Sequence, residues 1–196
     1  MVKPNSINTR KLVLLALLTA MVVVFQFLGA FIKFGPFSIS LVLMPIAVGA
    51  ALTGVLAGGW LGLVFGFVVL LSGDAALFFA VDPLGTVLVV LIKGMLAGLA
   101  AGLGYKMLAS MNRTAAVAAA AAICPVVNTG VFIIGSYMFF IPTISEWAGD
   151  AGVTSFIFLN MVGANFLVEF GLNLVLIPII VRLIQHGQDR GTAAKG

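Results

Sequence analysis

The chain has 196 residues, of which 62% are hydrophobic and only 8% charged, and its mean hydropathy is +1.25. A soluble domain carries roughly 45–50% apolar and about 25% charged residues, so this composition predicts an integral membrane protein. At about 20 apolar residues per span, the chain has room for roughly six or seven membrane helices. A sizeable extramembrane catalytic or nucleotide-binding domain is excluded, because no stretch is left to build one.

Six apolar runs follow one another along the chain: 12–32, 38–52, 55–72, 84–108, 115–140 and 156–184. The first is longer than the roughly 7–15 apolar residues of a signal peptide, so we expect a retained helix. The second passes into the third through Thr53 and Gly54 as a tight helical hairpin. We predict an all-α bundle of six transmembrane helices in a single domain, 12–184, between a basic N-terminus (1–11) and a polar tail (185–196).

The lysines and arginines of the short loops predict the orientation of the bundle. Eight of them fall on the N-terminal side of the membrane: Lys3, Arg10, Lys11, Lys106, Arg113, Arg182, Arg190 and Lys195. Only Lys33 falls on the opposite side. Because cytoplasmic loops carry the excess of positive charge, we expect a multi-pass protein with both termini in the cytoplasm.

Small residues recur every four positions in three of the predicted helices. Gly54, Gly58, Gly62 and Gly66 form one row, Gly94, Gly98 and Gly102 a second, and Ala16 and Ala20 a pair. Residues four apart share a helix face, and small side chains there let another membrane helix approach closely. We expect the second row to pack inside the bundle. The first row and the alanine pair suit either internal packing or docking on a separate membrane subunit.

Ionisable and amide side chains inside the apolar runs need a reason, because an ionisable group costs roughly 2.5–3.5 kcal/mol at the centre of a membrane helix. Lys93, Asn128, Asn165, Glu169 and Asn173 are the candidates, and their positions place them between the outer third and the midplane. Two interpretations remain open. A Lys93–Glu169 ion pair with amide partners would only hold helices together, whereas an outward-facing pocket would use Lys93 to hold an anionic group.

Several other residues carry two interpretations each. Tyr137 and Trp147 either line or cover such a pocket or belong to interfacial aromatic belts. Gln26 is either a link between helices or part of the pocket wall, and the apolar stretch Ala75–Val81 is either a lid or a hydrated loop. Cys124, the one cysteine, is expected to be a small core residue.

Catalysis, metals and nucleic acids find no support in the motifs. His186 is the one histidine and lies outside the runs, and the chain has no H-E-x-x-H, G-x-S-x-G or phosphate-loop motif. An acid–base pair of Glu169 with Asp74 or Asp82 would join carboxylates at different depths. We therefore predict no enzyme activity, no cofactor, no metal and no nucleic-acid partner.

The order of these features resembles the substrate-binding S components of energy-coupling factor (ECF) transporters for vitamins. The resemblance covers residues 8–186. The segments that carry it are the basic start, Leu14–Ala20, Pro36–Ser40, Pro45–Gly54, Lys93–Gly98 and Pro125–Thr129.

This resemblance implies a subunit of an importer in a bacterial plasma membrane. It would bind a vitamin-sized solute in its outer half. From the residues themselves, we expect Lys93, Asn128, Asn165, Glu169 and Tyr137 to be the binding residues. Ala16 and Ala20 match the family's docking motif for a transmembrane coupling subunit, and two cytoplasmic ATPases complete the complex. Pantothenate heads the list of substrates, because a lysine with several amides suits a carboxylate with hydroxyl and amide groups. The alternative is a stand-alone oligomeric channel or facilitator.

Overall fold

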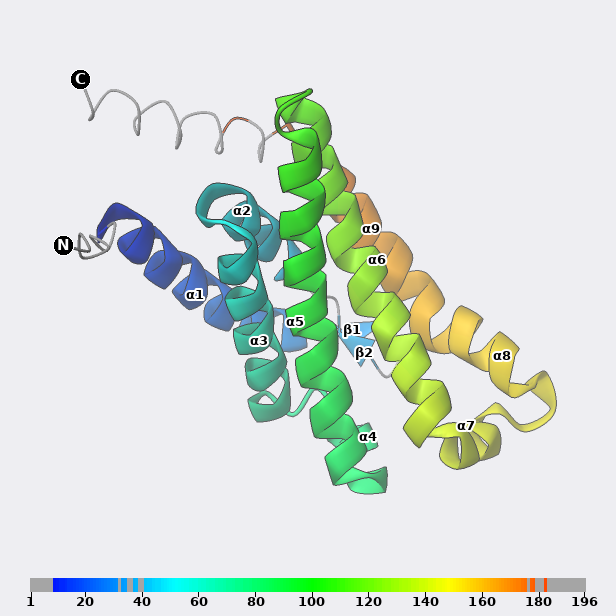
Figure 1. Ribbon diagram of the computed structural model, residues 1–196. Coiled ribbons are helices and arrows are strands. Elements are labelled where there is room, and N and C mark those ends of the chain that lie inside the picture. Colours follow the sequence, from blue (N-terminus) through cyan, green and yellow to red (C-terminus); the bar gives the residue numbers. More distant parts are fainter. Residues whose placement is uncertain are drawn as a thin grey trace, which may run out of the picture.

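A computed structural model describes residues 9–31, 33–34, 37–38, 41–175, 177–178 and 182 of the chain. Its elements in chain order are α1 (Thr9–Ala30), β1 (Lys33–Phe34), β2 (Phe37–Ser38), α2 (Leu43–Thr53), α3 (Val55–Leu71), α4 (Ala76–Val81), α5 (Pro83–Leu108), α6 (Arg113–Phe139), α7 (Ile141–Ala148), the 3-10 turn η1 (Gly149–Ala151), α8 (Val153–Ser155), the π-helix η2 (Phe156–Gly163) and α9 (Ala164–Val175) (Figure 1). The two short strands pair antiparallel, with Lys33 opposite Ser38. The expected helical architecture is confirmed.

Three of the described helices, α1, α5 and α6, are long and apolar enough to cross a membrane. Helices α2 and α3 and the Phe166–Val175 part of α9 are apolar but shorter. The count of six spans and the cytoplasmic placement of both termini therefore stay predictions. Residues 1–8 and 183–196, which make up most of the two predicted terminal segments, lie outside the described residues.

Two predicted boundaries were wrong. The second run was expected to be helical from residue 38, but α2 begins at Leu43, because Phe37–Ser38 pairs with β1 instead. The stretch after α3 was expected to be a loop up to Pro83, but Ala76–Val81 forms helix α4. This stretch is almost wholly apolar, and α4 packs against the start of α5 and buries Phe78.

Local capping explains where the long helices begin. The backbone N–H of Gly85 donates to the Asp82 side chain at 3.0 Å, and Pro83 occupies the first turn of α5. At the start of α6 the N–H of Ala115 donates to Asn112 at 3.0 Å. Between α2 and α3, Gly54 has φ +116°, a conformation open mainly to glycine, and this one residue makes the expected hairpin joint.

The two glycine rows face each other across a seam between α3 and α5. A Cβ atom on Gly58 would lie 2.5 Å from the carbonyl oxygen of Gly98, and one on Gly62 would overlap the carbonyl of Gly94. A Cβ on Gly66 would lie 2.7 Å from the Val90 oxygen. The backbones therefore touch directly, as small-residue membrane interfaces allow. Internal packing accounts for both glycine rows, from Gly58 onward in the first.

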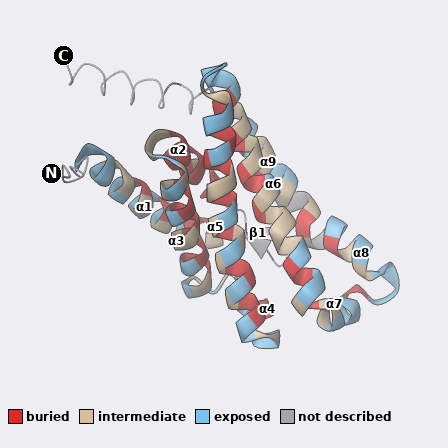
Figure 2. Ribbon diagram, in the orientation of Figure 1, coloured by how far each residue is buried: buried red, intermediate tan, exposed pale blue. Residues whose placement is uncertain are grey.

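Helix α1 lies on the outside of the bundle (Figure 1) and is buried along one stripe only: Leu18, Val22, Gln26 and Gly29. The indole N–H of Trp60 on α3 donates to the Thr19 hydroxyl at 3.3 Å and ties the two helices together. Ala16 and Ala20 are exposed, in contrast to the buried glycine seam (Figure 2). The alanine pair is thus available to a partner, while the glycine rows are not.

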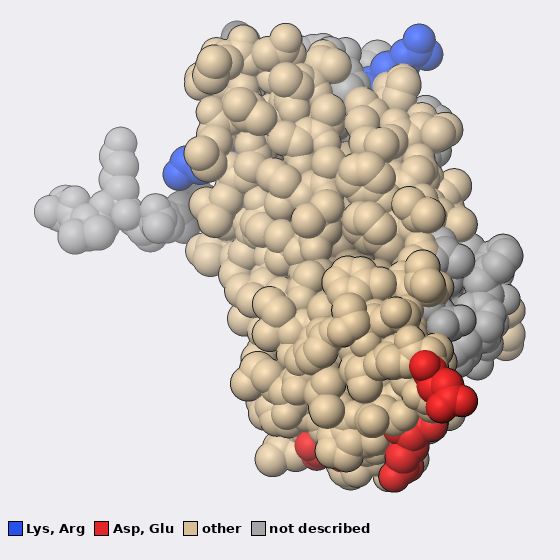
Figure 3. Space-filling model, turned by 90° about the vertical axis from the view of Figure 1, so that its right-hand side faces the viewer, with Lys and Arg blue, Asp and Glu red and all other residues tan. Residues whose placement is uncertain are grey.

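Charges of opposite sign gather at opposite ends of the molecule. Arg10 and Lys11 begin α1, Lys106 is in the last turn of α5 and Arg113 begins α6 at one end, whereas Asp82 precedes α5, Glu146 is in α7 and Asp150 is in η1 at the other. On the face seen in Figure 3, a broad surface without charged residues separates blue from red. Such an uncharged band between two charged ends is what a membrane-embedded bundle needs.

Candidate functional site

A cavity lies between helices α3, α5, α6 and α9, towards the acidic end of the bundle. It measures about 100 Å³, whereas a single water needs roughly 10–15 Å³ on the same measure. Five parts of the chain line it: α3, α4 with the turn before it, α5, α6 with the residue that follows it, and the η2–α9 segment. The lining residues are Phe65, Val69, Asp74, Ala75, Phe78, Thr86, Val89, Val90, Lys93, Asn128, Thr129, Phe132, Phe140, Val162, Phe166 and Glu169.

The cavity extends inward from the acidic end of α5. Thr86 stands one turn into this helix, where its hydroxyl donates to the Asp82 carbonyl at 2.7 Å. Lys93 lies seven residues further on, or roughly 10 Å deeper at 1.5 Å per residue. A solute entering from the acidic end would therefore pass Thr86 before it reached Lys93.

Three ionisable side chains line the cavity: Lys93, Asp74 and Glu169. Both carboxylates act electrostatically on the Lys93 ammonium, with Glu169 the stronger of the two. Glu169 is only 7% exposed. In the low dielectric of the bundle such attractions are several times stronger than in water, so Lys93 stabilises the charge of each carboxylate, and each carboxylate stabilises that of Lys93.

Aromatic rings surround the ammonium group. Lys93 Nζ lies 5.2 Å from the centre of the Phe132 ring and 5.8 Å from that of Phe65, within the range of a cation–π interaction. Phe78 meets Phe132 edge-on at 5.5 Å and Phe140 at 4.8 Å. The wall of the cavity is thus an interlocked set of rings from α3, α4 and α6.

Asn128 supplies an amide in the middle of this wall. Its side chain is 6% exposed, and its Oδ1 atom has no hydrogen-bond partner among the described residues. A buried amide oxygen without a partner costs on the order of 1–3 kcal/mol. The amide is therefore prepared to pair with a polar group that enters the cavity.

A hydrogen bond connects the cavity to the outer helix. The Gln26 amide on α1 donates to Asp74 Oδ2 at 3.1 Å, and Gln26 is 2% exposed. Of the two interpretations of Gln26, the link between elements is correct, since it is not among the residues that line the cavity. Asp74 joins α1 to the site.

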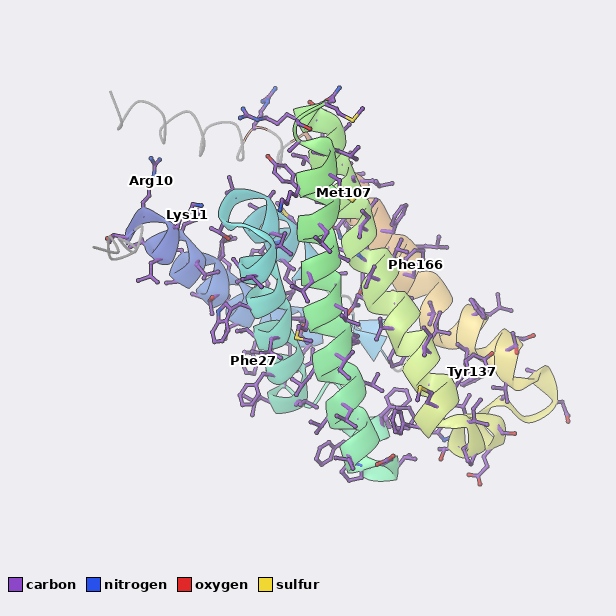
Figure 4. The ribbon with its side chains drawn as sticks, viewed as in Figure 1. Arg10, Lys11, Phe27, Met107, Tyr137 and Phe166 are labelled. Atoms are coloured by element: carbon purple, nitrogen blue, oxygen red, sulfur yellow. The ribbon has the colours of Figure 1, made fainter. Side chains whose placement is uncertain are left out.

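The structure brings together three of the five residues that the sequence nominated for binding. Lys93, Asn128 and Glu169 line one cavity. Tyr137 does not: it is 40% exposed, its hydroxyl lies 3.1 Å from that of Thr154, and in Figure 4 it sits far along α6 from Phe166. The side chain of Asn165 lies outside the described residues.

Sequence analysis missed Asp74 and the five phenylalanines of the lining. Asp74 looked like one of several loop acids, and the chain has 16 phenylalanines without a pattern that singles out five. Asn173, another of the polar candidates inside the apolar runs, donates through its side-chain amide to the backbone carbonyl of Glu169 at 2.8 Å and is 3% exposed. Its hydrogen bond lies within α9, and it does not line the cavity.

The arrangement suits reversible binding rather than chemistry. Among the described residues no three His, Cys, Asp or Glu side chains are grouped so as to hold a metal. Cys124 is fully buried in the core next to the site, as expected. An aromatic wall, one amide, one lysine and two carboxylates can recognise a small polar solute.

A family model described as "ECF transporter, substrate-specific component" matches residues 10–181. A search of curated proteins finds no match.

Proposed function

The chain belongs to the ECF transporter substrate-specific component family, and from that premise we propose that it captures a vitamin or related small metabolite outside the cell for an ATP-driven importer. The family match makes it a subunit for transport rather than an enzyme. The observation that carries the proposal is the cavity. It joins Lys93, Glu169 and Asn128 inside a largely apolar bundle.

Capture from the outside follows from the predicted orientation. With the basic end in the cytoplasm, the cavity opens towards the outer surface, where Thr86 and Phe140 form its shallow part. The short helix α4, which contributes Phe78, lies over this end and is suited to act as a lid. A solute would displace water from the rings and pair with Asn128 and the charged groups.

Release to the inside requires partners. A transmembrane coupling subunit would dock on the exposed face of α1 at Ala16 and Ala20, and two cytoplasmic ATPases would drive the cycle. The exposure of both alanines supports this role. Small residues let a partner helix approach the α1 backbone closely.

The ligand itself is the first thing to measure. Protein purified in detergent would be denatured, and the released small molecules identified by mass spectrometry. We expect one metabolite at close to one molecule per chain. Pantothenate, which Lys93 together with several amides suggested, is one candidate. An empty protein that also shows no thermal shift with a vitamin panel would contradict the proposal.

The docking face is tested by Ala16→Leu with Ala20→Leu. Each leucine adds three carbon atoms to an exposed position, so ligand binding by the isolated chain should stay within about twofold while uptake by the assembled importer is lost. Leu17→Ala, also on the exposed face, is the matched control for altered bulk. Loss of binding in the double variant would place these residues in the bundle instead.

The competing function is a stand-alone channel or facilitator. Its support is the broad apolar surface, which would also allow self-association. Flux measurements on liposomes that contain only the purified chain distinguish the channel from the importer subunit. Solute flux without partner subunits and without ATP would favour the channel, whereas tight binding with no flux would favour the importer subunit.

A further inference from the structure

We propose that a groove between α1 and α2, at the basic end of the bundle, binds an anionic phospholipid by one acyl chain and its phosphate head group. The groove is separate from the solute cavity, so this inference does not depend on the identity of the solute. Three features support it: the apolar lining, the arginine at one end and the length of the groove.

The groove is large and almost wholly apolar. Its volume is about 610 Å³, against about 100 Å³ for the solute cavity on the same measure. Nine of its eleven described lining residues are apolar, among them Val13, Met21, Val48 and Leu52. Val13 and Met21 are exposed, so the groove is open to the bilayer along α1. An acyl chain is already out of water there, so close packing would hold it in place.

The two polar residues of the described lining lie together at the basic end. Thr9 and Arg10 begin α1, and Figure 4 shows Lys11 close to Arg10 at this end of the helix. The five acids among the described residues lie at the opposite end of the bundle or in the solute cavity. Charge complementarity therefore favours an anionic head group over a zwitterionic one at this end of the groove.

Arginine is well suited to hold the phosphate of such a head group. A guanidinium group has five N–H donors in one plane and pairs with two phosphate oxygens at once. Because it has five donors, Arg10 can bind a phosphate and keep an interaction that it already makes within the protein. Basic pockets between membrane helices bind anionic lipid head groups in this way.

The length of the groove favours a lipid over a partner helix. Along α1 the lining runs from Thr9 to Met21, 12 positions later, or roughly 18 Å at 1.5 Å per residue. Half of a hydrocarbon core of about 30 Å is roughly 15 Å. The groove therefore ends near the midplane, as one lipid of a single leaflet requires, whereas a partner helix would cross the whole membrane. With the predicted orientation, this leaflet is the cytoplasmic one.

The lipid would leave the proposed docking face of α1 uncovered. Ala16 and Ala20 are exposed but are not among the described residues that line the groove. Lipid binding and docking of a coupling subunit therefore use different surfaces, and each can be tested on its own.

The test is a competition between two lipids on the full chain. Delipidated protein in detergent would be mixed with equal amounts of palmitoyl-oleoyl phosphatidylglycerol, which is anionic, and palmitoyl-oleoyl phosphatidylcholine, which has the same acyl chains and a zwitterionic head group. Native mass spectrometry counts the bound lipids. We expect one lipid per chain, with phosphatidylglycerol favoured about fivefold. Equal retention of both lipids, or retention of neither, would overturn the inference and leave the proposed function intact.

A charge variant then assigns the preference to the end of the groove. Arg10→Gln should lower the ratio of bound phosphatidylglycerol to phosphatidylcholine towards one. Arg113→Gln, also at the basic end but not among the described lining residues, should leave the ratio at about five. Both positions are exposed, so the fold tolerates either change. An unchanged ratio in Arg10→Gln would overturn the inference.

A matched pair of tryptophan variants tests the apolar part. Val13→Trp places a ring in the groove and should reduce retention of both lipids severalfold. Val24→Trp, at an equally exposed position of α1 outside the described lining, should not. Unchanged retention in Val13→Trp would place the lipid elsewhere and overturn the inference. A dimer of the parent that Val13→Trp alone dissociates would assign the groove to a second copy of the chain and would overturn it as well.

Discussion

Lys93 places an ammonium group inside an apolar helix, and several neighbouring side chains stabilise its charge. Two rings lie within 6 Å of its ammonium, and two carboxylates attract it. Removing one member of such a group leaves the others uncompensated, which in buried ion pairs costs more than the pair itself contributes.

We therefore expect Lys93→Met to lower the free energy of unfolding by about 2–4 kcal/mol. Glu169→Gln should also destabilise, and the double variant should recover part of the loss, because it removes both charges of the stronger pair. Thermal unfolding in one detergent, without ligand, compares the stability of the parent, the two single variants and the double variant. Strictly additive losses would show that the two residues do not interact.

Among individual residues, the sequence predicts those that are costly to bury in a membrane and misses those that are not. Lys93, Asn128 and Glu169 stand out because polar groups are rare inside apolar runs. Phe65 or Phe132 cannot be told from a lipid-facing phenylalanine such as Phe67 until the helices are placed. Asp74 needs the same information, because its role depends on Gln26, 48 positions earlier.

Among the helices, the seam between α3 and α5 tolerates added atoms least, because the two backbones are in contact. Gly62→Ala would gain roughly 1 kcal/mol of helix propensity, but its Cβ would overlap the Gly94 carbonyl, and overpacking costs about 1–3 kcal/mol or more when backbone must move. We expect a lower unfolding temperature. The fluorescence of Trp60 and Trp147 in detergent reports it.

Gly130→Ala is the matched control within α6. A Cβ there meets no atom within 4 Å, so the same substitution should leave the unfolding temperature unchanged or raise it slightly. Equal effects of the two substitutions would mean that the seam is looser than described.

Spacing along one helix predicts a face but not what covers it. The glycine rows were recognisable as interfaces, yet only the tertiary arrangement shows that the α3 row meets the α5 row while Ala16 and Ala20 stay exposed. The short pieces were missed for a related reason. Helix α4 and the β1–β2 pair are too short for periodicity to reveal them.

For the molecule as a whole, the main open prediction is its orientation. Cys124 is the one cysteine and is fully buried, so the parent protein should resist thiol reagents. Asp150→Cys, at the acidic end, should react with a membrane-impermeant maleimide on intact cells. Ser110→Cys, at the basic end, should react only after the membrane is opened. Both sites are exposed. The reverse pattern would invert the orientation.

Most of the architecture followed from composition and charge, because a membrane leaves few alternatives to apolar helices with charged ends. The cavity did not, since it depends on how five separate segments meet.

The Gln26–Asp74 hydrogen bond has a thermodynamic consequence. Asp74 lines the cavity, and Gln26 belongs to the helix that carries Ala16 and Ala20. If solute binding changes the strength of this bond, it also shifts the position of α1 and hence the affinity for whatever docks there. Linkage then requires the docked partner to change the affinity for the solute by the same factor. Through Gln26, the affinity of a docked partner for α1 would thus depend on whether the cavity is filled, although the partner does not contact the solute.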